Sequence, residues 1–69
     1  MSRSQAKRLL TNLEEFNHII LDFDGITFIG QGFADEIFRV YQNKRPTLII
    51  KNINLITEVK KMIQRVGVT

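Results

Sequence analysis

The apolar positions change their spacing along the chain, and each spacing predicts one element. Residues 3–15 carry them at helical intervals, which predicts an amphipathic helix capped by Ser2 or Ser4. Its expected inner positions are Ala6, Leu9, Leu10, Leu13 and Phe16. A short continuous run of β-branched and aromatic residues follows and predicts a strand buried on both faces; it contains Ile19, Ile20, Leu21 and Phe23.

The stretch from Ile19 to Phe38 is the centre around which the other elements are arranged. Asp24 and Gly25 end the strand, since an Asp-Gly pair favours a turn with positive φ. A second apolar patch at residues 26–29 leads into a glycine-spaced junction, and helical spacing resumes from Phe33 onward. The unit is therefore strand, loop and helix. In α/β folds such a junction is where function is usually placed.

The second half of the chain repeats the change from strand to helix. Residues 43–46 break the preceding helix, because the residue before a proline is biased away from helix. Residues 47–50 predict a second buried strand, residues 51–54 a connection, and residues 55–66 a helix that Gly67 caps. The inner stripe of that helix is Val59, Met62 or Ile63, and Val66. The order predicts a small α/β domain, an α-β-α-β-α unit with a short parallel sheet.

A two-stranded parallel sheet leaves both of its outer edges free to pair. Isolated sheets of this size are rarely stable, so something must cover these edges. The covering strands come either from chain that belongs to a longer protein or from another subunit, and the residues just before Ile29 are a candidate for a short third strand. A homodimer is one solution, because a two-fold axis can join free edges into one continuous sheet.

Composition narrows the class of protein further. The 69 residues predict one domain, residues 1–69, and the absence of cysteine excludes disulfides, thiolate metal sites and cysteine nucleophiles. The net charge of +3 is spread along the chain, which favours solubility more than nucleic-acid binding. Because the sequence shows neither a signal-peptide core nor a membrane-length apolar segment, we expect a cytoplasmic protein with no membrane contact. We expect no metal and no cofactor.

Two carboxylates at the end of the first strand are the sharpest chemical signal. Asp22 and Asp24 can suit an aspartyl nucleophile and a second acid around Mg²⁺, and the segment resembles the first motif of haloacid-dehalogenase-type phosphatases. Such enzymes need a lysine and further acidic ligands on later strands of a much longer core, whereas the acidic pair at 35–36 lies on a predicted helix. The alternative, which we favour, is that Asp22 accepts hydrogen bonds from loop amides and Asp24 makes the turn.

The glycine-spaced junction is the second signal. Gly30, Gln31 and Gly32 open a helix, where free backbone N–H groups favour an anion. The spacing matches neither a dinucleotide fingerprint nor a phosphate-binding loop. Close packing or the approach of a partner is therefore the favoured explanation. His18, the only histidine, is expected at the surface rather than in a metal site.

Four segments together resemble the STAS-like domain of unknown function of bacterial regulatory proteins, which is related to the STAS fold of anti-sigma factor antagonists. They are SRSQAKRLL, LDFDGITFIGQGFADEIFR, TLII and EVKKMI. The resemblance implies that Asp22 is the strand-end aspartate, that Phe28 and Ile29 form a hydrophobic pair, and that residues 30–32 stand where a phosphorylatable Asp-Ser-Ser segment would be. The serine is absent, and so are the N-terminal strands of a full STAS domain.

The resemblance predicts a non-catalytic protein-interaction module in bacterial transcription regulation or signalling. Its partner would be a regulatory protein or an adjoining domain, with a homodimer through a free sheet edge as a further expectation. The predicted partner-binding residues are Gly30, Gln31, Gly32, Phe33 and Asp35, supported by Asp22, Asp24 and Gly25. Phe33 has a core position as its alternative. Two other functions stay open, namely Mg²⁺-dependent phosphotransfer at Asp22 and Asp24, and nucleotide or nucleic-acid binding at residues 30–32.

Overall fold

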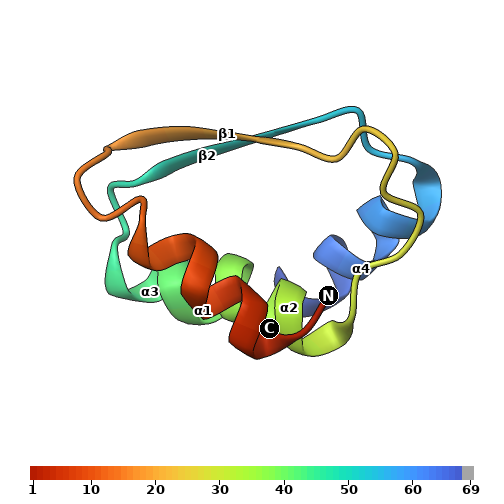
Figure 1. The fold of residues 1–69 in the computed structure, drawn as a ribbon, viewed down its shortest axis with the longest axis horizontal. Helices are drawn as coiled ribbons and strands as arrows, with labels where there is room; N and C mark the ends of the chain where they lie inside the picture. The colour runs from red at the N-terminus through yellow and green to blue at the C-terminus, as the bar shows by residue number, and fades with distance from the viewer. Residues whose placement is uncertain (68–69) are drawn as a thin grey trace.

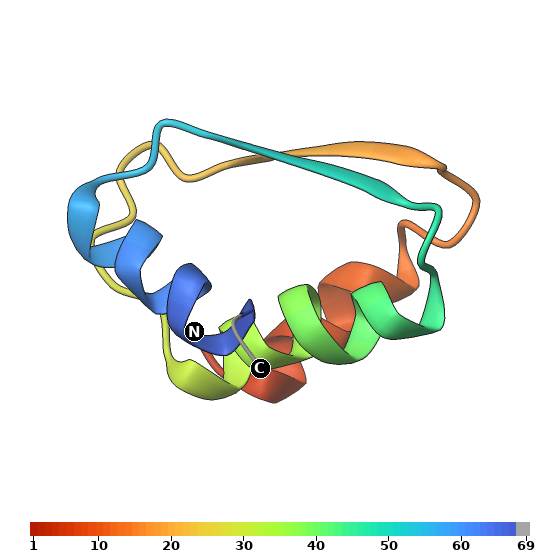
Figure 2. The same ribbon diagram turned by 180° about the vertical axis from the view of Figure 1, so that it is seen from behind.

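The fold has two layers, a sheet on one side and all the helices on the other, as Figures 1 and 2 show from opposite directions. The structure is a computed structural model that describes residues 1–67. In chain order the elements are α1 (Arg3–Thr11), β1 (His18–Asp22), α2 (Gln31–Asp35), the π-helical segment η1 (Glu36–Tyr41), α3 (Gln42–Lys44), β2 (Ile49–Ile53) and α4 (Thr57–Gly67). Because α2, η1 and α3 follow one another without a break, they form a single crossover helix between the strands. The predicted order of elements is confirmed.

The two strands pair in parallel, as the sequence predicts. Their register runs from His18 opposite Ile49 to Asp22 opposite Ile53. The second strand was placed too early, however, because β2 begins at Ile49 and continues through the expected connection to Ile53. Residues 45–48, between the end of α3 and the start of β2, form a turn that is closed by a hydrogen bond of 3.0 Å from the Leu48 N–H to the Arg45 C=O.

The prediction that the first strand is buried on both faces is wrong. Ile19 is buried, whereas its neighbour Ile20 is 60% exposed, and Ile49 on β2 is 57% exposed. Successive side chains of a strand point to opposite faces of the sheet, and the helices cover only one of these faces. The sheet therefore has one packed face and one open face.

The core lies between the packed face of the sheet and the helices. Its buried members are Ala6, Leu10, Phe23, Ile29, Phe33, Ala34, Ile37, Val59 and Val66. The inner stripe predicted for the last helix is confirmed, since Met62 and Ile63 pack against this cluster, although α4 begins at Thr57 rather than Leu55. The cap predicted at Gly67 depends on residues 68–69, which lie outside the described residues.

The first helix is shorter than predicted. Ser2 is its cap, with a reciprocal pair of hydrogen bonds between Ser2 and Gln5, but α1 ends at Thr11 and Asn12 is the C-cap. Phe16 lies beyond this end and is 54% exposed, so it is not an inner position. The helical spacing continues past the point where the hydrogen-bonded helix stops.

The loop between β1 and α2 contains no third strand within the described residues. Gly25 has a φ of 78°, which confirms the predicted turn with positive φ. The crossover helix begins at Gln31 with Gly30 as its N-cap, so it opens at the predicted glycine junction, while the helical spacing of apolar residues starts at Phe33. Phe23 and Ile29 hold the two ends of this loop in the core.

Candidate functional site

Asp22 joins the two loops that leave the sheet. Its Oδ1 accepts the backbone N–H of Asp24 at 2.9 Å and the side-chain amide of Asn54 at 2.9 Å. These hydrogen bonds, first that from Asn54 and then that from Asp24, lower the pKa of Asp22 below its ordinary value. Asn54 has a φ of 58°, so the carboxylate also stabilises a left-handed residue just after β2.

The interpretation of Asp22 as an acceptor for loop amides is confirmed. The sequence did not identify Asn54, although its place after the parallel neighbour of β1 is the signal that could have done so. Among residues 1–67, no group of three or more His, Cys, Asp or Glu side chains could hold a metal ion. At the end of β1, the hydrogen bonds of Asp22 connect the turn after β1 with the turn after β2.

The glycine junction is packed against the first residues of the same chain. A Cβ added at Gly30 would lie 2.8 Å from the backbone oxygen of Met1, and one added at Gly32 would lie 3.4 Å from the Cβ of Arg3. Gly30 therefore allows a close approach that a larger residue would prevent. The sequence favoured either close packing or the approach of a partner as the reason for these glycines, and the structure shows close packing.

Arg3 ties the start of α1 to the crossover helix. Its guanidinium contacts Asp35 at 2.9 Å and Glu36 at 3.1 Å. Arg39 also contacts Asp35, with its Nη2 at 2.9 Å from the Oδ2 that Arg3 contacts. The hydrogen bonds from Arg39 and then Arg3 lower the pKa of Asp35 to about 2. Glu36, 5% exposed, lies beside them in the core layer.

These ion pairs change the role of Asp35. The carboxylate is half-buried and serves contacts within the chain, so its predicted availability for a partner is reduced. The Asp35–Arg39 pair could have been found from its helical i, i+4 spacing. The contribution of Arg3 could not, since it depends on how two distant helices pack.

The other predicted partner-binding residues differ in exposure. Phe33, at 6% exposed, belongs to the core, which is the alternative that the sequence left open. Gly30 and Gly32 are half-buried, and only Gln31 has an exposed side chain. Of the supporting residues, Asp22 and Asp24 are brought together at the turn.

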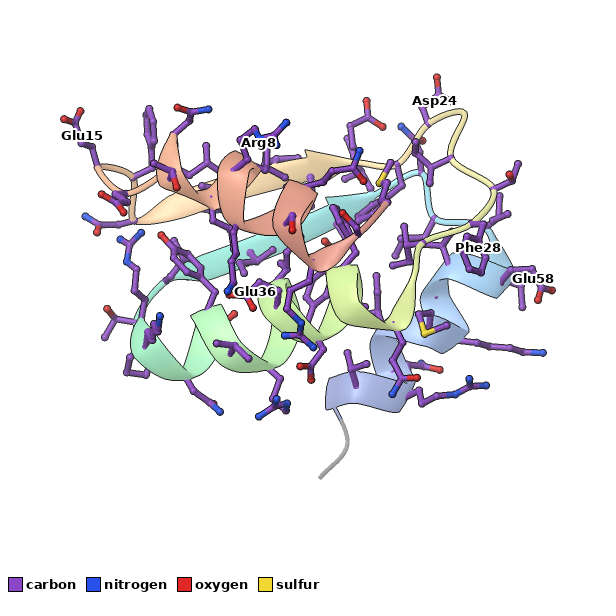
Figure 3. The ribbon with its side chains drawn as sticks, turned by 60° about the horizontal axis from the view of Figure 1, so that its bottom comes forward. Arg8, Glu15, Asp24, Phe28, Glu36 and Glu58 are labelled. Carbon is purple, nitrogen blue, oxygen red and sulfur yellow. The ribbon has the colours of Figure 1, made fainter. Side chains whose placement is uncertain are left out.

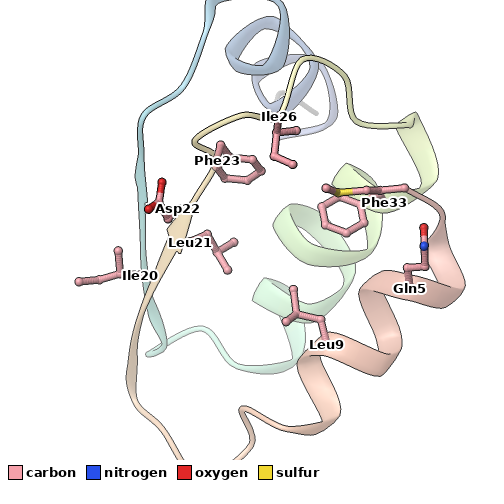
Figure 4. A pocket seen from close by; sticks show the side chains of 9 residues that line it. Gln5, Leu9, Ile20, Leu21, Asp22, Phe23, Ile26 and Phe33 are labelled. Carbon is pink, nitrogen blue, oxygen red and sulfur yellow. The ribbon is translucent and has the colours of Figure 1, made fainter.

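A groove of about 440 Å³ runs between β1 and α1 (Figure 4). The side chains of Leu9, Leu21, Phe23 and Phe33 converge on it, whereas Ile20 points away from the helices. Most of the lining is apolar; the lining residues are Met1, Gln5, Leu9, Ile20, Leu21, Asp22, Phe23, Ile26 and Phe33. No residue of β2 lines the groove, so it lies on the side of β1 that faces away from its partner strand.

Phe28 projects from the loop before the crossover helix. It is 66% exposed, whereas Ile29 next to it is 1% exposed, so the hydrophobic pair of the resemblance is divided between surface and core. A shallow hollow of about 150 Å³ separates Phe28 from α4; it is lined by Phe28, Ile29, Glu58, Lys61, Met62 and Arg65. Figure 3 shows Phe28 beside Glu58, at the opposite end of the molecule from Glu15.

The model of the STAS-like domain of unknown function (DUF4325) matches residues 5–60 of the chain. The chain therefore belongs to this family, and its two-stranded parallel sheet with helices is consistent with a STAS-like fold. No curated protein and no solved structure matches the sequence. Within the part of the chain that the structure describes, no helix has the length and apolar character to cross a membrane.

Proposed function

We propose that this STAS-like domain is a non-catalytic protein-interaction module in the bacterial cytoplasm, acting in transcription regulation or signalling. One observation carries the proposal. Phe28 is a large aromatic side chain that stands 66% exposed next to a fully buried neighbour, at the strand-to-helix junction. Aromatic residues, phenylalanine among them, are enriched in the cores of protein–protein interfaces relative to the rest of the surface.

The loop holds Phe28 in position before any partner arrives. Ile29 is buried in the core, and Gly30 packs under the backbone of Met1, so the residues after Phe28 are fixed. Phe23 fixes the other end of the loop, with the Ile26 N–H bonded to the Phe23 C=O at 2.9 Å. A loop backbone that is already ordered loses less conformational entropy on binding, which favours affinity.

The surroundings of Phe28 indicate the chemistry of the partner. Glu58, Lys61 and Arg65 of α4 border the hollow beside it, and Gln31 lies three residues further along the chain at the start of the crossover helix. This arrangement resembles an apolar anchor with a polar rim. A regulatory protein or adjoining domain with an apolar pocket and charges of both signs around it would be complementary.

The predicted partner-binding set takes different roles in this proposal. Gln31 contacts the partner directly. Gly30 and Gly32 allow residues 1–3 to pack close to the start of the crossover helix, and Asp35 holds residues 1–3 there through its ion pair with Arg3. Phe33 supports the helix from the core. Phe28 replaces Phe33 as the aromatic contact.

The experiment compares three variants of the tagged chain expressed in its own cells. Phe28→Ser and Gln31→Arg should each lose the co-purified partner, while Phe16→Ser should retain it. Phe16 is a matched control because it is also an exposed phenylalanine, 54% against 66%, but lies before β1 rather than after it. Binding is then repeated with the purified partner, and circular dichroism verifies that the variants are folded. Equal partner binding by all three variants would contradict the proposed surface.

A further inference from the structure

The backbone groups of β1 alternate between its two edges. In a parallel pair, alternate residues direct both their N–H and their C=O to the neighbouring strand. The Asn17 C=O accepts the Ile49 N–H at 3.0 Å, and the Phe23 N–H donates to the Ile53 C=O at 3.0 Å. These two bonds identify the odd-numbered residues as those that face β2. The backbone groups of the even-numbered residues, 18, 20 and 22, therefore face the opposite edge.

That opposite edge has the properties of a pairing site. Within residues 1–67 the sheet contains only β1 and β2, so no strand of the chain lies beside it. β1 is HIILD, so its edge has neither proline nor lysine, two of the residues that commonly prevent edge pairing. The groove of about 440 Å³ runs along this side, with the apolar residues Met1 and Leu9 exposed near it.

We infer that a second copy of this chain binds the free edge of β1, with the two β1 strands antiparallel around a two-fold axis at Ile20. In this register Ile20 faces Ile20 of the partner subunit, and His18 faces Asp22 of the partner subunit. All three facing pairs use the even-numbered residues, so about six backbone hydrogen bonds can form. The result is a continuous four-stranded sheet in which β2 takes the outer position on each side.

The side chains of β1 are self-complementary in this register. His18 and Asp22 lie on the open face with Ile20 between them, and an imidazole N–H can donate a hydrogen bond to a carboxylate directly across a strand pair. The two hydrogen bonds to Asp22 both go to Oδ1, which leaves Oδ2 for the histidine of the partner subunit. Moving the axis to Ile19 would place His18 opposite Ile20 of the partner subunit. Moving the axis to Leu21 would place Ile20 opposite Asp22 of the partner subunit, so either shift loses the match of His18 with Asp22.

The edge of β2 lacks this complementarity. A two-fold axis at its central residue would place Lys51 opposite Lys51 of the partner subunit, and like charges directly opposite are unfavourable. Pairing β1 of one copy with β2 of the next would build an open chain of subunits rather than a closed dimer. The charges therefore favour the β1 edge and the closed two-fold arrangement.

The dimer also covers apolar side chains that are exposed in a single copy. Ile20, Met1 and Leu9 all lie on or beside the groove, and a strand added about 4.8 Å from β1 would lie over it. Phe28 is outside this interface. The dimer and the proposed partner site can consequently be tested separately.

The absence of cysteine makes a direct test of the register possible. Facing residues of a hydrogen-bonded antiparallel pair have Cα atoms about 5.5 Å apart, which is within the range of a disulfide. Ile20→Cys should therefore become a covalent dimer on mild oxidation. Ile49→Cys is the matched control, similarly exposed at 57% on the same face, but its copy would lie three strand spacings away and about four residues further along, roughly 20 Å in all.

The oligomeric state of the uncross-linked protein is measured by sedimentation equilibrium. The wild-type chain should have twice its monomer mass of 8.0 kDa at micromolar concentration. Ile20→Lys should be monomeric, because it places two like charges at the axis, whereas Ile49→Lys should remain dimeric. His18→Asp should weaken the dimer at least tenfold. A monomeric wild type, or equal cross-linking of the two cysteine variants, would overturn the inference.

Discussion

Gly30→Ala tests whether the first residues of the chain really pack on the helix start. Two effects oppose each other at this position. Gly30 has φ −73° and ψ 156°, which alanine adopts freely, so the lower entropy of the unfolded chain would stabilise the variant by about 0.4–1 kcal/mol. Against this, the new Cβ would lie 2.8 Å from the backbone oxygen of Met1. Overpacking of this kind costs about 1–3 kcal/mol, so the contact should decide the sign.

Relief of the contact requires the N-terminal residues to move. Met1 cannot shift alone, because Ser2 is fixed as the cap of α1 through its bonds with Gln5, and Arg3 is held by Asp35 and Glu36. We therefore expect Gly30→Ala to lower the free energy of unfolding by about 1–2 kcal/mol. Gly32→Ala is the matched control. Its Cβ would make ordinary contact with Arg3 at 3.4 Å, and alanine is up to about 1 kcal/mol better than glycine inside a helix.

The assay is urea unfolding followed by circular dichroism at equilibrium. With a slope of about 1 kcal/mol per molar urea for so small a domain, the midpoint of Gly30→Ala should fall by about 1–2 M. The midpoint of Gly32→Ala should stay the same or rise. If both variants were stabilised alike, the packing of residues 1–3 on the helix start would be refuted.

The remaining predictions concern the core, the ion pairs and the turn. Ile37→Ala should lose about 2–5 kcal/mol in the same urea assay, because Ile37 is fully buried, and Ile20→Ala, measured below the concentration at which dimers form, should lose far less. Because the pKa of Asp35 is lowered to about 2, its ion pairs stabilise the fold fully above about pH 4, and this stabilisation is lost as the pH falls through about 2. In a series of unfolding measurements at decreasing pH, Asp35→Asn should therefore lose less stability between about pH 4 and about pH 2 than the wild type. The purified chain should hydrolyse no phosphoester with Mg²⁺; hydrolysis that Asp22→Asn abolishes would support the phosphotransfer alternative instead.

The spacing of apolar residues predicted the fold because the core is built from local periodicities. The stripe of α4, the Asp-Gly turn and the order of elements all depend on residues within a few positions of one another. The open face of the sheet was missed for a physical reason. The apolar run at residues 19–21 has the same composition whether helices cover one face of the strand or both.

The candidate site was predicted in part. The role of Asp22 follows from its place at a strand end, and Gln31 was correctly placed at the surface of a helix start. The contacts of Arg3 with Asp35 and Glu36 join residues more than thirty positions apart, so no local pattern contains them. Phe28 and Ile29 are equivalent in sequence terms, and only the path of the loop decides which of them is buried.

The most direct test of the interaction proposal is a chemical-shift titration of the isotopically labelled chain with its purified partner. The account predicts that the perturbed amides gather around Phe28 and Gln31 and along the first turns of α4, while those of Asp22 and Asp24 change little. Perturbations by the partner that centre on Asp22 and Asp24 and leave the amides around Phe28 and Gln31 unchanged would contradict it.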